Sequence, residues 1–195
     1  MKRPLQYVLV CLLVVLSSVV CGMSINPDDF DVQVDVIHQE DVFRITASYK
    51  TPLNLCQAYR YLTDYEAAKN IPGILESKYT RLSANKVSVE RLADETILLF
   101  RVRLNSVLEY IEYPYFGTEF TQVKGNAKSF VGKWQLESFA DGTTFKYQGV
   151  VSLDSSIPMF VIEYFIKSNM RQKFAAMASI AAERKNLAVS SCTRS

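Results

Sequence analysis

The sequence contains little histidine, glycine and proline, and each shortage excludes a class of protein. Its 195 residues include seven glycines, six prolines and one histidine, His38. A metal site built on two or more histidines is therefore excluded, and a Ser-His-Asp triad could form only around His38. So few glycines and prolines exclude a fibrous or low-complexity chain. Because 49% of the residues are apolar, the composition predicts one globular domain with a sizeable core.

The chain also has no excess of charge of either sign. It contains 22 lysines and arginines against 20 aspartates and glutamates. Two of the basic residues, Lys2 and Arg3, lie in the first 22 residues, which contain no acid, so the remainder is balanced. Proteins that bind nucleic acid neutralise phosphates with clustered basic side chains. The balanced charge therefore predicts no nucleic-acid partner.

A basic start followed by an apolar run indicates that residues 1–22 are a secretory signal peptide. The stretch from Leu5 to Cys21 is uncharged and mostly apolar, and it ends at small residues. We expect cleavage before Met23. Lipidation of Cys21 and an uncleaved membrane anchor are the alternatives. The segment predicts a periplasmic or secreted protein, with a membrane-anchored form as the alternative.

Removal of the leader would leave two cysteines, Cys56 and Cys192. An oxidising compartment allows them to form a disulfide bond. Cys56 lies in an expected helix and Cys192 in the C-terminal tail, and nothing in the sequence brings them together. We favour a buried Cys56 and a free Cys192 thiol, with the Cys56–Cys192 bridge as the alternative.

Alternation of apolar and polar residues predicts strands through most of the chain. Residues 31–50 alternate in two stretches and indicate two short strands, with a break at Gln39-Glu40-Asp41. Six further strands are expected at 74–82, 86–92, 96–112, 117–124, 129–138 and 143–153. The short connections between them predict antiparallel neighbours. Several of these strands have one apolar face, which another element must cover.

Two helical regions are expected on either side of these strands. The first starts at Thr51, as a hydroxyl N-cap followed by proline, and breaks near Asp64 before a short helix over 65–70. The second runs from Ser156 to about Lys185 without a glycine. About 30 residues at about 1.5 Å per residue make a helix long enough to cross a sheet. Strands in the middle and a long helix at the end predict an α+β fold.

Four segments carry a resemblance to a known superfamily. CQAYRYLTDYE at 56–66 and IPGI at 71–74 are followed by GKWQLE at 132–137 and GTTFKY at 142–147. In this order they resemble the START-like superfamily (SRPBCC), in particular its polyketide cyclase/dehydrase and coenzyme-Q-binding branch. The resemblance extends over about residues 42–185.

The resemblance implies a helix-grip fold, in which an antiparallel curved sheet wraps around the long C-terminal helix. It also implies a cavity between sheet and helix for a hydrophobic small molecule, such as a lipid, sterol, quinone or isoprenoid. No cofactor, metal or catalytic residue is carried over. The expected organisation is a signal peptide over 1–22, an N-terminal extension over 23–41, a START-like ligand-binding domain over 42–188 and a flexible tail over 189–195.

Ten side chains are expected to lie at the sheet–helix interface and to contact the ligand, given the phase of their strands and of the long helix. They are Phe100, Tyr110, Phe130, Trp134, Phe145, Tyr147, Phe160, Tyr164, Arg171 and Phe174. Four of them (Tyr110, Tyr147, Tyr164 and Arg171) could orient a carbonyl group if the protein were a polyketide cyclase/dehydratase-like enzyme. The plainer interpretation is that the tyrosines pack their rings and Arg171 lies at the edge.

We therefore expect an exported carrier of a hydrophobic small molecule and favour it over an enzyme. A protein-interaction module with a filled core is a further alternative. The aromatic turn Tyr113–Gly117 is either a lip for transient membrane contact or a packed hairpin end. His38 is expected at the surface beside a turn. Asp28, Asp29 and Asp31 do not have the pattern of a calcium loop, and we expect them in a solvated, flexible segment. The oligomeric state stays open.

Overall fold

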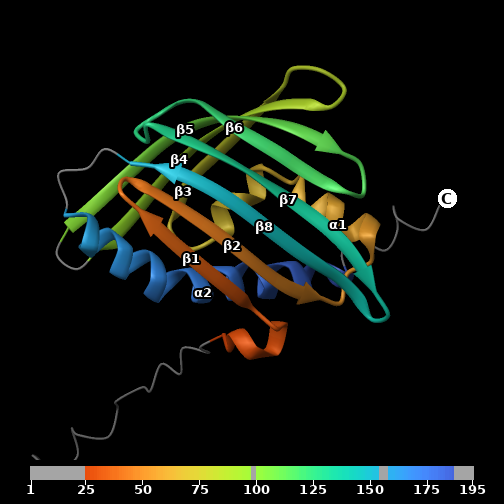
Figure 1. The fold of residues 1–195 in the computed structure, drawn as a ribbon. Coiled ribbons are helices and arrows are strands. Elements are labelled where there is room, and N and C mark those ends of the chain that lie inside the picture. Colours follow the sequence, from red (N-terminus) through yellow and green to blue (C-terminus); the bar gives the residue numbers. More distant parts are fainter. Residues whose placement is uncertain (1–24, 98–99, 154–157, 187–195) are drawn as a thin grey trace, which may run out of the picture.

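The computed structural model describes residues 25–97, 100–153 and 158–186, and the side chains of 96–100 are not described. One eight-stranded antiparallel sheet curves over a long helix, α2 (Figure 1). In chain order the elements are η1 (Pro27–Phe30), β1 (Gln33–Gln39), β2 (Val42–Thr51), α1 (Leu55–Leu62), η2 (Glu66–Asn70), β3 (Ile74–Arg81), β4 (Lys86–Ile97), β5 (Phe100–Tyr113), β6 (Gly117–Gly125), β7 (Ser129–Phe139), β8 (Gly142–Ser152), α2 (Met159–Glu183) and η3 (Arg184–Asn186).

The strand order is β1-β2-β8-β7-β6-β5-β4-β3. Strands β3 to β8 follow one another as hairpins, and the hairpin of β1 and β2 joins the sheet beside β8, the last strand. Helix α2 then runs along the inner face of the curved sheet (Figure 1). This arrangement is the helix-grip α+β fold that the sequence predicts.

Helix α1 begins three residues later than predicted. Its N-cap is Asn54, which accepts a hydrogen bond from the backbone N–H of Gln57, while the Gln57 side chain accepts one from the N–H of Asn54. This capping box satisfies two of the free donors at the helix start. Thr51 instead ends β2, where it pairs with Thr143 of β8 and is 2% exposed. The predicted break after α1 and the short helix that follows are confirmed.

The predicted break at residues 93–95 is wrong, because β4 continues to Ile97. Two acidic residues suggested a turn there, but both form ion pairs with residues of neighbouring elements. Asp94 pairs with Arg101 of the adjacent strand β5, and Glu95 pairs with Lys173 of α2. A strand tolerates charges whose partners lie on the adjacent elements.

The phase predicted for the first half of α2 is wrong. Phe160 and Tyr164 are 72% and 65% exposed, whereas Ile162 and Ile166 are buried. The buried side chains follow an i, i+4 row through Ile166 to Phe174, and each such step turns about 40° around the helix axis. Because the buried row spirals around the helix, a single helical phase assigned to all of α2 pointed to the wrong residues in its first half.

The N-terminal extension is folded, and the predicted flexible segment is wrong. Asn26 caps η1, and η1 and β1 both contact α2. Arg171, predicted to face the ligand, points to this extension instead: its guanidinium donates to the Asp28 carboxylate at 2.5 Å and to the carbonyl oxygen of Val32 at 3.3 Å. The prediction failed because it omitted an element that covers this side of the helix.

Cys56, the second residue of α1, is disulfide-bonded, so the favoured interpretation of a buried Cys56 outside any disulfide is wrong. The other cysteines, Cys11, Cys21 and Cys192, lie outside the described part of the chain, as do the predicted signal peptide and tail. The pairing of Cys56 with Cys192 therefore stays a prediction.

Candidate ligand-binding site

The inner face of the sheet carries most of the side chains that the sequence assigned to the ligand. Six of the ten belong to the core between the sheet and the helices or pack against it: Tyr110, Phe130, Trp134, Phe145, Tyr147 and Phe174. Phe160, Tyr164 and Arg171 face away from it, and the side chain of Phe100 lies outside those described. The contact of these side chains with a ligand stays a prediction.

The rings under α2 contact one another closely. Tyr49 stacks on Phe145 with ring centroids 4.8 Å apart, and Trp134 lies 4.8 Å from Tyr147. Phe174 of α2 completes the group at 5.5 Å from Tyr147. Such distances are those of favourable aromatic pairs. On the side of β2, β8 and β7, the space between sheet and helix is therefore filled by the protein's own side chains.

Toward β4 and β5 the same interface contains a hollow of about 80 Å³. It is lined by Tyr61, Leu62, Asp64, Ala67, Ala68, Ile71, Arg91, Tyr110, Trp134 and Met177. A volume of this size holds a few water molecules, whereas pockets for small molecules are typically about 300–1,000 Å³. A hydrophobic small molecule of ordinary size would therefore have to enlarge this hollow.

Arg91 is a polar group in this hollow that lacks a partner among the residues the structure describes. It follows Val87 and Val89 on the inner face of β4, and both valines are fully buried. Its Nε is buried without a hydrogen-bond partner, and the guanidinium lies 5.6 Å from the ring centroid of Tyr110. It makes no ion pair with any residue the structure describes. Buried polar groups are normally paired, so Arg91 has unused capacity to bind an acceptor.

The sequence offered a signal for Arg91 that our interpretation missed. In the alternation Val87-x-Val89-x-Arg91, an arginine occupies a position whose phase places it among inward-facing valines. A charged residue in the apolar phase of a strand marks either an edge or a site.

The buried tyrosines are hydrogen-bond donors rather than bases. Burial raises the pKa of Tyr49 and of Tyr147, so both phenols keep their protons at neutral pH. The Tyr49 hydroxyl is a second buried group without a hydrogen-bond partner. The inner face thus provides an uncommitted cation and a neutral donor, which suit binding of a ligand oxygen.

The nearby carboxylates are already paired. Glu112, 6% exposed, accepts hydrogen bonds from the Arg81 guanidinium at 3.0 Å and from the Tyr65 hydroxyl at 3.1 Å. Asp64 at the rim of the hollow forms an ion pair with Arg184 at 2.6 Å. Neither carboxylate is free to act on a ligand, and both connect elements of the fold.

A larger hollow, about 590 Å³, lies on the opposite face of the sheet across β3 to β6. Its walls include Glu76, Lys78, Glu90, Leu92, Val107 and Lys124. Charges of both signs alternate there, and Lys78 pairs with Glu76 at 3.1 Å. The mixed charge favours neither an anionic nor a cationic ligand.

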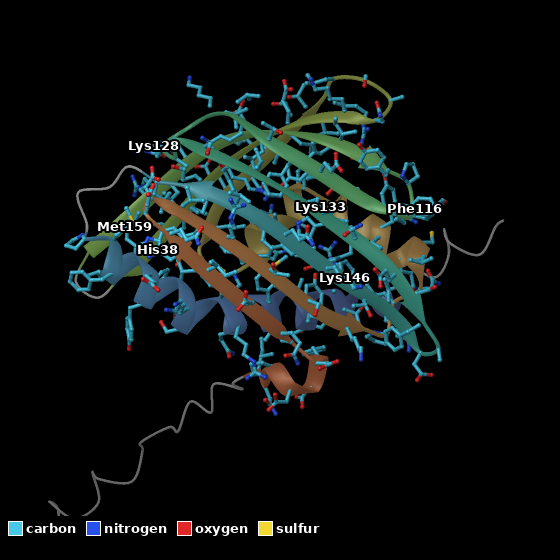
Figure 2. All side chains as sticks on the ribbon, in the orientation of Figure 1. His38, Phe116, Lys128, Lys133, Lys146 and Met159 are labelled. Carbon is cyan, nitrogen blue, oxygen red and sulfur yellow. The ribbon has the colours of Figure 1, made fainter. Side chains whose placement is uncertain are left out.

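The aromatic turn Tyr113–Gly117 projects from the end of the sheet. The N–H of Phe116 donates to the carbonyl oxygen of Tyr113 at 2.9 Å, and Tyr115 adopts a left-handed φ of 66°. Phe116 is 75% exposed, and Figure 2 shows it at the tip of the molecule. The exposed ring disfavours the packed hairpin end, and membrane contact stays a prediction.

Within the described residues, no helix has the length and apolar character needed to cross a membrane. Nor does this part of the chain gather three or more histidine, cysteine, aspartate or glutamate side chains that could hold a metal ion.

An antiparallel sheet curved around one long helix, with a small interior beside an unpaired arginine, defines a helix-grip protein. Comparison with solved structures identifies the fold as START-like. The structure is similar to a STAR-related lipid transfer protein from Xanthomonas axonopodis (TM-score 0.60, 14% identity, 76% of this chain and 98% of that one). No family model and no curated protein matches the sequence.

Two further solved structures show the range of proteins with this fold. Human STARD10 gives a TM-score of 0.60 at 12% identity, covering 82% of this chain and 76% of that one. The Zhui aromatase/cyclase from Streptomyces sp. R1128 gives 0.59 at 10% identity, covering 79% and 99%. At such identities the likeness establishes the fold alone.

Proposed function

We propose that the protein binds a hydrophobic small molecule between the inner face of its sheet and α2, and that Arg91 binds an oxygen of this ligand. The observation that carries the proposal is the Arg91 guanidinium, which lines the interior hollow without an ion-pair partner among the described residues. The planar guanidinium of an arginine prefers acceptors that take two parallel hydrogen bonds, such as carboxylate or phosphate. The preferred ligand is therefore an amphiphile with an acidic or carbonyl group.

Binding requires the hollow to expand. Its helical side is formed by Ala67, Ile71 and Met177, and the ion pairs Lys173–Glu95 and Arg184–Asp64 connect α2 to the facing elements. Burying ten methylene groups contributes about 8 kcal/mol, at about 0.8 kcal/mol each. Breaking partly exposed ion pairs costs about 1 kcal/mol or less each. A medium-length chain could therefore offset the opening of the interface.

Relatives by fold agree with the class of ligand. The Xanthomonas protein is described as a lipid transfer protein and the Streptomyces protein as an aromatase/cyclase. A lipid carrier and a cyclase-like enzyme would both use an apolar interior with a polar anchor. The paired carboxylates and protonated tyrosines of this chain favour the carrier. The small hollow supports a second candidate, an interaction module with a filled core.

The test is a titration with a fluorescent fatty acid and with its methyl ester, together with mass spectrometry of a solvent extract of the purified protein. We expect saturable binding of the acid, at least tenfold weaker in Arg91→Met. Arg103→Met, which removes an arginine 57% exposed on the outer face of β5, is the matched control and should bind normally. Absence of both extracted lipid and saturable binding would reject the carrier in favour of the filled-core module.

We also propose that the protein is exported, on the strength of the basic and apolar pattern of residues 1–22. The mass of the mature protein tests this directly. A chain that begins at Met23 supports cleavage, a lipid-modified Cys21 supports anchoring, and an intact chain in the cytoplasm rejects export.

A further inference from the structure

His38 connects the edge of the sheet to α2. It lies near the end of β1, beside a turn as the sequence predicted, but its side chain is only 15% exposed rather than at the surface. Its Nδ1 is 2.8 Å from a carboxylate oxygen of Glu163 on α2, and its Nε2 is 2.7 Å from the carbonyl oxygen of Glu40. The ring stacks on Phe43 at 4.3 Å between centroids. Figure 2 shows His38 near Met159, at the end of the molecule opposite Phe116.

Both partners of the His38 ring are acceptors. A carbonyl oxygen can only accept, and the pKa of Glu163 is lowered by hydrogen bonds from Lys167 and His38, so its carboxylate is ionised at neutral pH. A neutral imidazole has one N–H and can form only one of the two hydrogen bonds as donor. The imidazolium has two N–H groups and forms both. The surroundings of His38 are thus complementary to its protonated form.

We propose that His38 is a protonation latch, which holds the first half of α2 more tightly against the edge of the sheet when the imidazole is protonated and loosens this contact when the imidazole is neutral. This inference does not depend on the identity, or the existence, of a ligand in the interior. It assigns a role to the chain's only histidine, which the proposed ligand site does not use.

Among the described residues, the contact between Glu163 and His38 is the polar contact that joins the first turns of α2 to the sheet. Pro158 occupies the N-cap position, and no side-chain hydrogen bond caps the helix start. Val161 and Ile162 are buried, so apolar packing also holds this segment. The next polar contacts with the N-terminal extension, from Arg171 and Gln172, lie two turns further along. Loss of the Glu163 contact would therefore leave the first turns held by apolar packing and make their opening more frequent.

The charged groups that face His38 come from α2 and from the turn between β1 and β2. On α2 these are Glu163 and Lys167, which pair at 2.6 Å. On the turn between β1 and β2 they are Glu40 and Asp41, and Asp41 is held by Lys128 at 2.9 Å. Phe43 faces the ring from β2 and is uncharged. Histidine is the side chain whose ordinary charge change falls between pH 5 and 8.

The sign of the pH dependence follows from the two partners. Protonation of His38 favours the latched state, so this contribution is present while the imidazole carries its second proton and is lost when a rise in pH removes it. Glu163 has a lowered pKa, so its contribution is present near neutral pH and is lost as the pH falls through the titration of the carboxyl. The latch is therefore strongest while the imidazole is protonated and the Glu163 carboxylate is ionised.

Hydrogen exchange of residues 159–168, corrected for the intrinsic effect of pH, tests the latch in the full chain. A charge-assisted hydrogen bond predicts openings about tenfold rarer at pH 6 than at pH 8. In His38→Phe, which keeps a ring on Phe43 but has no N–H, the pH difference should vanish. Lys167→Met is the matched control on the same carboxylate and should keep the difference. Equal protection at both pH values in the wild type, or a difference that survives in His38→Phe, would overturn the proposal.

A second measurement covers the case in which His38→Phe does not fold. In a chain without a histidine tag, the imidazole signals in a nitrogen-correlated NMR spectrum belong to His38 alone. We expect two slowly exchanging ring N–H signals at pH 6 and one at pH 8, with Glu163→Gln losing the slow exchange at Nδ1. A neutral ring at pH 6, or an unchanged spectrum in Glu163→Gln, would reject the latch.

Discussion

The two sides of the inner sheet face differ in how completely they are packed. Under β2, β8 and β7, Tyr49 and Phe145 are 1% and 0% exposed, and Ala175 and Ala178 bring α2 close to them. Under β4 and β5, the interface contains a hollow, an unpaired arginine and the Lys173–Glu95 ion pair. The first side is closely packed and apolar, as a protein core must be. The second side contains unfilled space and charged groups, and so departs from both requirements. Departures of this kind are expected where a protein binds something.

The largest effect should follow from breaking the packed side. Phe145→Ala removes a ring that contacts Tyr49 and Tyr61, and should lower the free energy of unfolding by about 3–5 kcal/mol. Phe116→Ala, at an exposed ring, is the control and should change it by less than about 0.5 kcal/mol. Denaturant unfolding measures both. Similar values for the two variants would show that the ring stack is not the stabilising core.

The second prediction concerns the phase of α2. Ile166→Ala should cost about 2–3 kcal/mol, because Ile166 is 8% exposed within the core, whereas Tyr164→Ala should cost less than about 0.5 kcal/mol. Thermal and denaturant unfolding of the two variants measure these costs. The reverse order would support the phase predicted from the sequence, in which Tyr164 lies at the sheet–helix interface.

The third prediction is a change of opposite sign on the second side. Arg91→Met replaces a half-buried, unpaired cation with an apolar chain of similar size, and should raise the free energy of unfolding by about 1 kcal/mol while weakening ligand binding. Unfolding in the absence of ligand measures the first effect. Destabilisation with unchanged binding would mean that Arg91 serves the fold rather than a ligand.

The smallest effect concerns Glu163 and depends on pH. Since the folded-state pKa of Glu163 is lowered, Glu163→Gln should reduce the melting temperature slightly at pH 6, and the difference should disappear as the pH falls through the titration of the carboxyl. Melting curves from pH 3 to pH 6 measure it. A deficit that persists at pH 3 would point to lost packing instead of lost charge.

Local patterns predicted the elements well where neighbouring residues decide them. The alternation in β7 and β8 indicated both strands and their apolar faces, and the break after α1 was visible at Asp64. Predictions failed where a distant partner decides. Asp94 and Glu95 suggested a turn until Arg101 and Lys173 supplied their counterions from other elements.

The candidate site was half predictable for the same reason. Strand period two gave the correct face for Tyr110, Trp134 and Tyr147, since a strand keeps its phase along its length. The helical phase predicted for α2 was wrong in its first half, because the sheet surface that α2 covers is curved and its buried row of side chains spirals around the helix. Arg91 could have been noticed as a charge in an apolar phase, but its lack of a counterion depends on what surrounds it.

The sequence by itself determined the order of strands and helices, their antiparallel connections and the apolar face of each strand, because these depend on residues a few positions apart. Only the tertiary structure decided which side chains meet and which stay alone. His38 and Glu163 are 125 positions apart and become partners, while Arg91 receives none among the residues described. Both outcomes depend on how the sheet curves around α2, which no local pattern specifies.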